Sequence, residues 1–146
     1  MQFKESIFIN RPVEEVFAYV TDYSTHPLWA DAVRVDILTP GPIGVGTRLY
    51  YVDKTLGREV GAESEITVYE PPHRLGYKIV TNMAAEAMQT FSAENGGTRF
   101  TWEYEAEPTG VMGLLKVVEP LLAPLARKTL RTAQKRLKDL LEAGQG

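Results

Sequence analysis

Residues 10–29 read NRPVEEVFAYVTDYSTHPLW and predict a helix followed by a second, short helical turn. Pro12 suits the first helical position, because its φ is already close to the helical value and a first-turn residue makes no use of its N–H. The residues behind it form one apolar stripe at helical spacing, namely Val13, Val16, Phe17 and Val20. The chain then turns sharply before Pro27, and we expect Trp29 to anchor this turn in the core.

Seven stretches have the period-two alternation of half-buried strands. They are residues 2–9, 33–37, 47–53, 60–69, 74–81, 85–93 and 98–106. Glycine, proline and asparagine mark the turns between most of them, which predicts hairpins and an antiparallel sheet. Because the helical stretch lies between the first strand and the other six, we predict a curved sheet with helices along one side, and such a shape encloses a hollow.

The C-terminal segment is predicted to cover the apolar face of this sheet. Its apolar residues recur at spacings of three and four, namely Leu115, Val118, Leu122, Ala126, Leu130, Ala133, Leu137 and Leu141. Pro120 and Pro124 interrupt the pattern, and each removes an N–H donor from a helix. We therefore expect a short helix over residues 113–118, a break, and a long helix to about Leu141.

Composition excludes several classes of site. The 146 residues fit one domain and contain no cysteine, which excludes disulfides, thiolate nucleophiles, iron–sulfur clusters and cysteine zinc sites. The two histidines, His26 and His73, are far apart in sequence and each adjoins a proline, so we expect surface or capping roles and neither a metal nor a cofactor. No apolar run is long enough to span a bilayer and the N-terminus lacks a signal core, so a cytoplasmic location is expected.

The glycine-rich loop at residues 41–46, GPIGVG, is predicted to be a hairpin loop. Its glycine spacing differs from that of phosphate-binding loops, and it leads into a strand instead of the N-terminus of a helix. No GxSxG motif supports an activated serine.

This order of elements resembles the helix-grip fold of the START-like superfamily, also called SRPBCC, and more specifically its polyketide cyclase/dehydrase and lipid-transport branch. The residues that carry the resemblance are 12–17, 21–22, 29, 45–48, 69–75 and 97–100. The resemblance covers essentially the whole chain, as one α+β domain over residues 1–146, with a seven-stranded curved antiparallel sheet wrapped around a long C-terminal helix and two short helices after the first strand. Its motifs are structural, so they speak for the fold more than for an activity.

The resemblance implies a cavity between the concave face of the sheet and the terminal helix, which holds a hydrophobic or amphipathic small molecule. The strand pattern predicts the cavity lining as Ala62, Ser64, Tyr77, Ile79, Gln89, Phe91, Phe100, Trp102, Tyr104, Leu115, Val118 and Leu122. Val60, Ile66 and Val68 are expected on the same face, and in the strand at 47–53 Leu49 and Tyr51 are preferred to Arg48, Tyr50 and Val52. Burial alone would also explain the aromatic stripe, but the small Ala62 and Ser64 leave room for a ligand.

Three functions remain open, and the first is favoured. In the first, the protein is a carrier or sensor of a lipid, polyketide or similar molecule, which enters beside residues 110–124, stacks on Trp102 and Tyr104 and is capped by the glycine loop. The second is a polyketide cyclase or aromatase with Tyr77, Tyr104 or an inward Arg48 as acid or base, its catalytic residues otherwise unassigned. Arg48 or Arg58, if turned inward, would pair with a ligand carboxylate or phenolate.

The third function is protein interaction through the basic face of the last helix, made of Arg127, Lys128, Arg131, Lys135, Arg136 and Lys138. The same face would allow weak contact with an anionic surface, although such a run is usually only solvated. We expect no nucleic-acid partner and no integral membrane association. A monomer and a homodimer both remain open.

Overall fold

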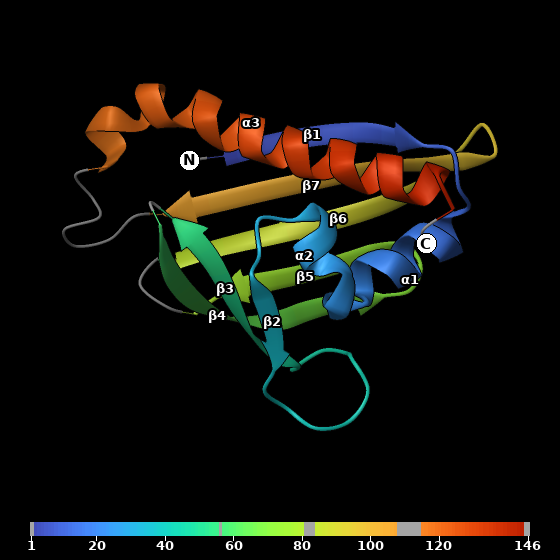
Figure 1. The fold of residues 1–146 in the computed structure, drawn as a ribbon, viewed down its shortest axis with the longest axis horizontal. Helices are drawn as coiled ribbons and strands as arrows, with labels where there is room; N and C mark the ends of the chain where they lie inside the picture. Colours follow the sequence, from blue (N-terminus) through green and yellow to red (C-terminus); the bar gives the residue numbers. More distant parts are fainter. Residues whose placement is uncertain (1, 56, 81–83, 108–114, 145–146) are drawn as a thin grey trace.

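The computed structural model describes residues 2–55, 57–80, 84–107 and 115–144. In that part of the chain seven strands form one antiparallel sheet in the order β1-β7-β6-β5-β4-β3-β2. The elements are β1 (Gln2–Ile9), α1 (Val13–Thr21), the 3-10 helix η1 (Tyr23–Thr25), α2 (His26–Trp29), β2 (Arg34–Ile37), β3 (Arg48–Thr55), β4 (Arg58–Glu70), β5 (Arg74–Ile79), β6 (Ala84–Glu94), β7 (Gly97–Glu107) and α3 (Leu115–Glu142). All three α-helices lie on one face of the curved sheet (Figure 1). The predicted helix-grip architecture is therefore confirmed.

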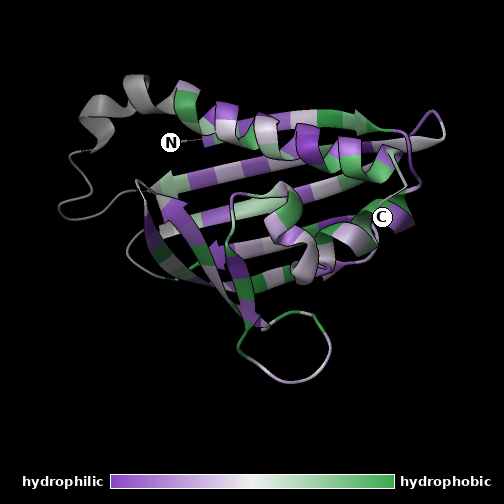
Figure 2. Ribbon diagram, in the orientation of Figure 1, coloured by the Kyte–Doolittle hydropathy of each residue, from purple (hydrophilic) through white to green (hydrophobic). Residues whose placement is uncertain are grey.

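The alternation along the strands sets which residues face the helices. Figure 2 shows hydrophilic and hydrophobic bands alternating along the strands. In β7 Phe100 and Trp102 lie opposite Phe91 and Gln89 of β6, and Phe100 is completely buried. Leu49 of β3 belongs to the core cluster and Tyr51 packs against it, whereas the equally buried Val52 does not, so the inward set preferred for this strand, Leu49 and Tyr51, is confirmed.

A β-bulge in β4 changes the face of the residues that follow it. The register between β4 and β5 shifts between Ile66 and Val68. Ile66 is fully buried, and past the shift Tyr69 packs on Phe17 of α1 with ring centroids 5.7 Å apart. Val68 therefore faces the opposite side, where a side chain on Gly76 would contact it. The prediction that Val68 faces inward is wrong, because a bulge adds one residue and reverses the alternation.

The segment at 10–29 folds as predicted except at the first residue of its helix. Pro12 has an extended ψ of 152° and is the N-cap, so the helix begins at Val13 and not at Pro12. The apolar stripe is buried, with Val16 and Val20 fully inaccessible. Trp29 is likewise fully buried, and its indole N–H donates to Thr25 Oγ1 at 3.3 Å. The core anchor expected at Trp29 is thus confirmed.

The last helix is continuous from Leu115 to Glu142, so the predicted break at the prolines is wrong. Pro120 and Pro124 are four residues apart, which places them on nearly the same side of a helix. The two backbone hydrogen bonds that these prolines cannot donate therefore lie on one side of the helix. The backbone hydrogen bonds on the other side can still form and keep the helix continuous. A proline in a helix can be accommodated in this way by bending.

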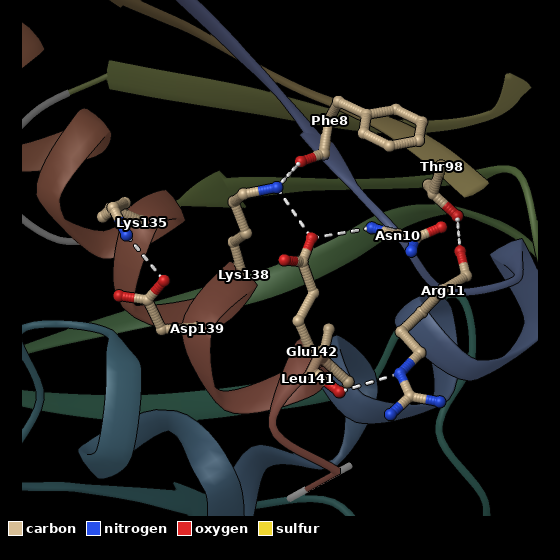
Figure 3. Close-up of polar contacts among 9 residues, drawn as sticks. All are labelled: Phe8, Asn10, Arg11, Thr98, Lys135, Lys138, Asp139, Leu141 and Glu142. Atoms are coloured by element: carbon tan, nitrogen blue, oxygen red, sulfur yellow. Dashed lines mark hydrogen bonds and ion pairs between the residues drawn. The ribbon is translucent and has the colours of Figure 1, made fainter. Parts of the chain in front are cut away.

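The C-terminal end of α3 is tied to the corner between β1 and α1 (Figure 3). Lys138 Nζ donates to the carbonyl oxygen of Phe8 at 2.7 Å and to Glu142 Oε2 at 2.7 Å. The Glu142 carboxylate also accepts from the backbone N–H of Asn10 at 2.9 Å, and Arg11 Nε donates to the carbonyl of Leu141 at 2.9 Å. These bonds fix the end of the helix over the first strand.

Replacing Lys138 with Met is expected to lower the free energy of unfolding by about 1 kcal/mol, because it removes a charge-assisted bond to a backbone carbonyl as well as an ion pair. Lys135→Met is the matched control. Among the described residues Lys135 pairs only with Asp139, one helical turn away, and both side chains are more than half exposed (64% and 59%). Its loss should cost less than about 0.5 kcal/mol. Urea unfolding of the two variants measures the difference, and equal costs would contradict an anchoring role for Lys138.

Candidate functional site

A cavity of about 300 Å³ lies between the concave face of the sheet, α2 and α3. Seven stretches of the chain contribute to its described lining, namely residues 23–31, the five strands β3 to β7, and α3. The lining residues are Tyr23, His26, Ala30, Asp31, Leu49, Tyr51, Asp53, Ala62, Ser64, Tyr77, Ile79, Gln89, Trp102, Tyr104, Thr129, Leu130 and Ala133. Strand parity explains the selection, because every strand residue in this set occupies an inward position. Most of the wall is apolar or aromatic, and several polar groups project into it.

Seven of the predicted site residues line this cavity, namely Ala62, Ser64, Tyr77, Ile79, Gln89, Trp102 and Tyr104. Phe91 and Phe100 are not among the lining residues, because their rings stack on each other with centroids 5.0 Å apart and fill the core beside α1. The side chains of Leu115, Val118 and Leu122 lie outside the described residues. The described contribution of α3 comes from Thr129, Leu130 and Ala133, nearer its C-terminus. A ligand-binding role for these residues remains a prediction.

Two expected elements of the site lie elsewhere. Arg48 projects from the outer face of the sheet, where its guanidinium pairs with Glu63 at 3.2 Å and Glu65 at 3.3 Å. Arg58 is exposed at the start of β4. The glycine loop at 41–46 contributes no residue to the described cavity lining, so it does not cap the cavity. Neither the inward arginine nor the glycine cap is therefore present.

His26 is buried, contrary to the surface or capping role expected for it. Its side chain is only 6% exposed and lines the cavity. Nε2 lies 2.7 Å from the carbonyl oxygen of Val20, and Nδ1 lies 3.2 Å from the hydroxyl oxygen of Tyr51. Because a carbonyl only accepts, the Nε2 atom carries the proton, and neutral Nδ1 accepts the hydroxyl hydrogen of Tyr51. His73 is exposed, as expected.

Burial lowers the pKa of His26 from its ordinary 6.5 to about 4, against smaller opposing effects of the Val20 carbonyl and the charge of Asp22. Between these two values the unfolded chain binds a proton at this position and the folded protein does not. His26 therefore contributes stability that is complete above pH 6.5 and is lost as the pH falls toward 4.

The difference in unfolding free energy between the native protein and His26→Gln should therefore narrow on acidification. Between pH 7 and pH 4.5 we expect a narrowing of up to about 3 kcal/mol. Urea unfolding at the two pH values measures it. A His26→Gln difference that is independent of pH would contradict the neutral, buried imidazole.

Asp53 is the carboxyl group that the strand alternation places on the cavity. Its Oδ1 is inaccessible and has no hydrogen-bond partner among the described residues. Burial and, to a smaller extent, the negative charge of Asp31 raise the pKa of Asp53 to about 6. Burial also raises the pKa values of the four phenols in the lining, that of Tyr104 to about 12 and those of Tyr23, Tyr51 and Tyr77 further. These phenols are neutral near pH 7, and among the described lining groups whose pKa burial shifts, Asp53 titrates closest to pH 7.

Asp53 was identifiable from the sequence, because it continues the inward set of Leu49 and Tyr51 by two residues. Tyr23, His26, Ala30 and Asp31 were harder to find. They follow the predicted helix in two short helical turns and the loop behind them, which are too short for a period to indicate the direction of a side chain.

Some chemistry is not supported by the described residues. They contain no cluster of three or more His, Asp or Glu side chains placed to hold a metal ion. Within the same part of the chain, no helix has the length and hydropathy required to cross a bilayer. The arrangement is an apolar cavity with a polar, ionisable end, which suits a molecule with an apolar body and a polar group.

Comparisons with known proteins agree with this architecture. The structure matches a Thermus thermophilus protein, TTHA0849, at a TM-score of 0.82 and 18% identity, over 100% of both chains. A START superfamily protein from Mycobacterium smegmatis matches at a TM-score of 0.77 and 15% identity over 97% of each chain. The di-domain ARO/CYC BexL of the BE-7585A biosynthetic pathway matches at 0.67 and 22% identity, over 94% of this chain and 50% of that one.

These likenesses show the START-like fold. No match was found among proteins with curated descriptions. The model of the family described as polyketide cyclase/dehydrase and lipid transport matches residues 1–142. The chain therefore belongs to the polyketide cyclase/dehydrase and lipid-transport family.

Proposed function

We propose that the protein is a carrier or sensor that binds a hydrophobic or amphipathic small molecule in the cavity beneath α3. The observation that carries the proposal is a space of about 300 Å³ that the described side chains leave open, even though aromatic residues surround it. Protein interiors are normally packed without voids of this size, and the exceptions are often binding sites. Family membership supports a small-molecule ligand in general terms.

The experiment is a titration with neutral apolar probes, Nile red and 1-octanol. Trp102 lines the cavity and Trp29 lies beside it, with ring centroids 6.2 Å apart. The chain contains two tryptophans, so a ligand in the cavity should change the intrinsic fluorescence. We expect saturable binding of one molecule per chain, with native mass spectrometry giving the stoichiometry.

Trp102→Phe should abolish most of the change in intrinsic fluorescence that the ligand causes, while Nile red still binds. This variant therefore separates the fluorescence reporter from binding itself. If neither probe binds at all, the carrier or sensor proposal fails.

A cyclase is the second candidate, favoured by one specific observation. Asp53 lines the cavity and has a pKa of about 6, which suits a general acid or base, and Tyr104 lines the same space. Enzymes of this kind would fold a poly-carbonyl chain in the cavity and steer its condensation by orientation. The test is cyclised product from such a chain, which Asp53→Asn and Tyr104→Phe should each reduce, and unchanged turnover in both variants would exclude this mechanism.

Protein interaction through the basic face of α3 gains no support. Four of its six basic residues form ion pairs within the chain. Arg131 pairs with Glu5, Lys135 with Asp139, Arg136 with Asp31 and Lys138 with Glu142. Much of the positive charge of this face is thus already compensated.

A further inference from the structure

We infer that the polar end of the ligand is a hydrogen-bond donor, and that an amphipathic amine suits the cavity better than a fatty acid. This inference rests on the proposed function and names the ligand class of the same cavity. It follows from the groups at the polar end of the lining, contributed by β3, by the segment after α2 and by β7.

The polar end of the lining contains a hydrogen-bond acceptor without a donor among the described residues, the Oδ1 atom of Asp53. Asp53 Oδ1 is shielded from water and accepts no hydrogen bond from the described residues. A buried carboxylate oxygen without a donor costs free energy, commonly about 1–3 kcal/mol or more. A ligand that donates to this oxygen would recover that cost, whereas a ligand that only accepts would leave it in place.

The hydroxyl group of Tyr51 is oriented by its hydrogen bond to His26. Its hydrogen points to Nδ1 of the neutral His26, because Nε2 of that ring donates to the Val20 carbonyl. Toward the cavity, Tyr51 therefore presents the lone pairs of its oxygen. Two positions apart on β3, Tyr51 and Asp53 both lie on the inward face and both offer acceptors.

The charged side chains among the described lining residues are acidic. Asp31 and Asp53 both line the cavity, and no lysine or arginine appears among the described lining residues. Arg136 of α3 lies nearby and bonds to Asp31 at 3.3 Å, but both of these side chains are more than half exposed (51% and 64%), so the pair is screened by water. A ligand carboxylate at this end of the cavity would face the charge of Asp53 with no basic side chain among the described lining residues to pair with it. An ammonium group would pair with the Asp53 carboxylate and could donate to both acceptors on β3.

The experiment compares three probes with the same tail, octylamine, 1-octanol and octanoate, by calorimetry at pH 8. We expect octylamine to bind at least about tenfold more tightly than octanoate, with 1-octanol between them. Asp53→Asn should weaken octylamine by about tenfold and change 1-octanol by less than about threefold. Asp36→Asn, an exposed carboxylate on β2 paired with Arg34, is the matched control and should leave the order unchanged.

The pH dependence gives a second readout that needs no variant. The groups that face Asp53 are Asp31, Tyr51 and Tyr104, with Arg136 bound to Asp31, and Asp53 titrates at about pH 6. The carboxyl group of Asp53 is therefore mostly protonated and neutral at pH 5, and mostly ionised at pH 8. Octylamine should bind more weakly at pH 5, while the affinity of the uncharged 1-octanol should change much less.

The outcomes separate the two proposals. If 1-octanol binds but octanoate binds as tightly as octylamine, the inference is overturned and the carrier or sensor proposal stands. If octylamine keeps its advantage in Asp53→Asn and at pH 5, Asp53 is not the recognition group and the inference is likewise overturned. If no probe binds, Nile red included, both proposals fall together.

Discussion

Leu137→Ala is expected to lower the free energy of unfolding by about 3 kcal/mol, within the usual range of 2–5 kcal/mol for a buried leucine. Leu137 is fully buried and belongs to the core cluster that joins α3 to the sheet. Truncation removes its contacts and leaves a space that the neighbouring side chains can fill only in part. Urea unfolding followed by far-UV circular dichroism measures the loss.

Leu125→Ala is the matched control on the same helix. Leu125 is 63% exposed, so the same substitution there should change stability by no more than about 0.5 kcal/mol. Similar costs at the two positions would contradict the orientation of α3 on the sheet.

Ala62→Phe is expected to weaken binding of 1-octanol and Nile red by at least about tenfold, which is about 1.4 kcal/mol of binding free energy. Ala62 lies on the inward face of β4 opposite Tyr51, and its small side chain lines the cavity. A phenyl ring there would take up part of the roughly 300 Å³ that a ligand needs. Because the ring fills existing space, the variant should be as stable as the native protein or more stable.

Ala93→Phe makes the same change at an exposed position of β6 away from the cavity lining. It should leave binding within about twofold of the native value, since it adds the same ring without filling the cavity. If Ala62→Phe is stable and binds both probes as tightly as Ala93→Phe, the cavity is not the binding site.

The sheet was predictable because the sequence signals that define its strands and turns are local. Alternation defined the strands, and the turn residues between them fixed the hairpins. The face of Val68 was not predictable, because the bulge beside Ile66 reverses the alternation without any glycine or proline to mark it. The continuity of α3 was missed for a related reason, since proline chemistry gives the cost of each lost bond but not whether the packed helix sustains it.

The site was predictable in part. Strand parity placed Tyr77, Gln89, Trp102 and Tyr104 on the inward face, and all four line the cavity. The role of His26 depends on Tyr51, 25 residues later, and on the carbonyl of Val20. Such a contact arises only when α2 is packed against β3, so no local pattern could indicate it.

The ligand's position in the complex provides the most direct test of a binding site beneath α3. Isotope-filtered nuclear Overhauser spectra of the protein with 1-octanol would identify the protons that contact the alkyl chain. We predict contacts with Ile79, Trp102 and Leu130, which come from three different elements and meet only in the cavity. Contacts confined to exposed apolar residues such as Val45 and Leu125 would contradict a ligand site beneath α3.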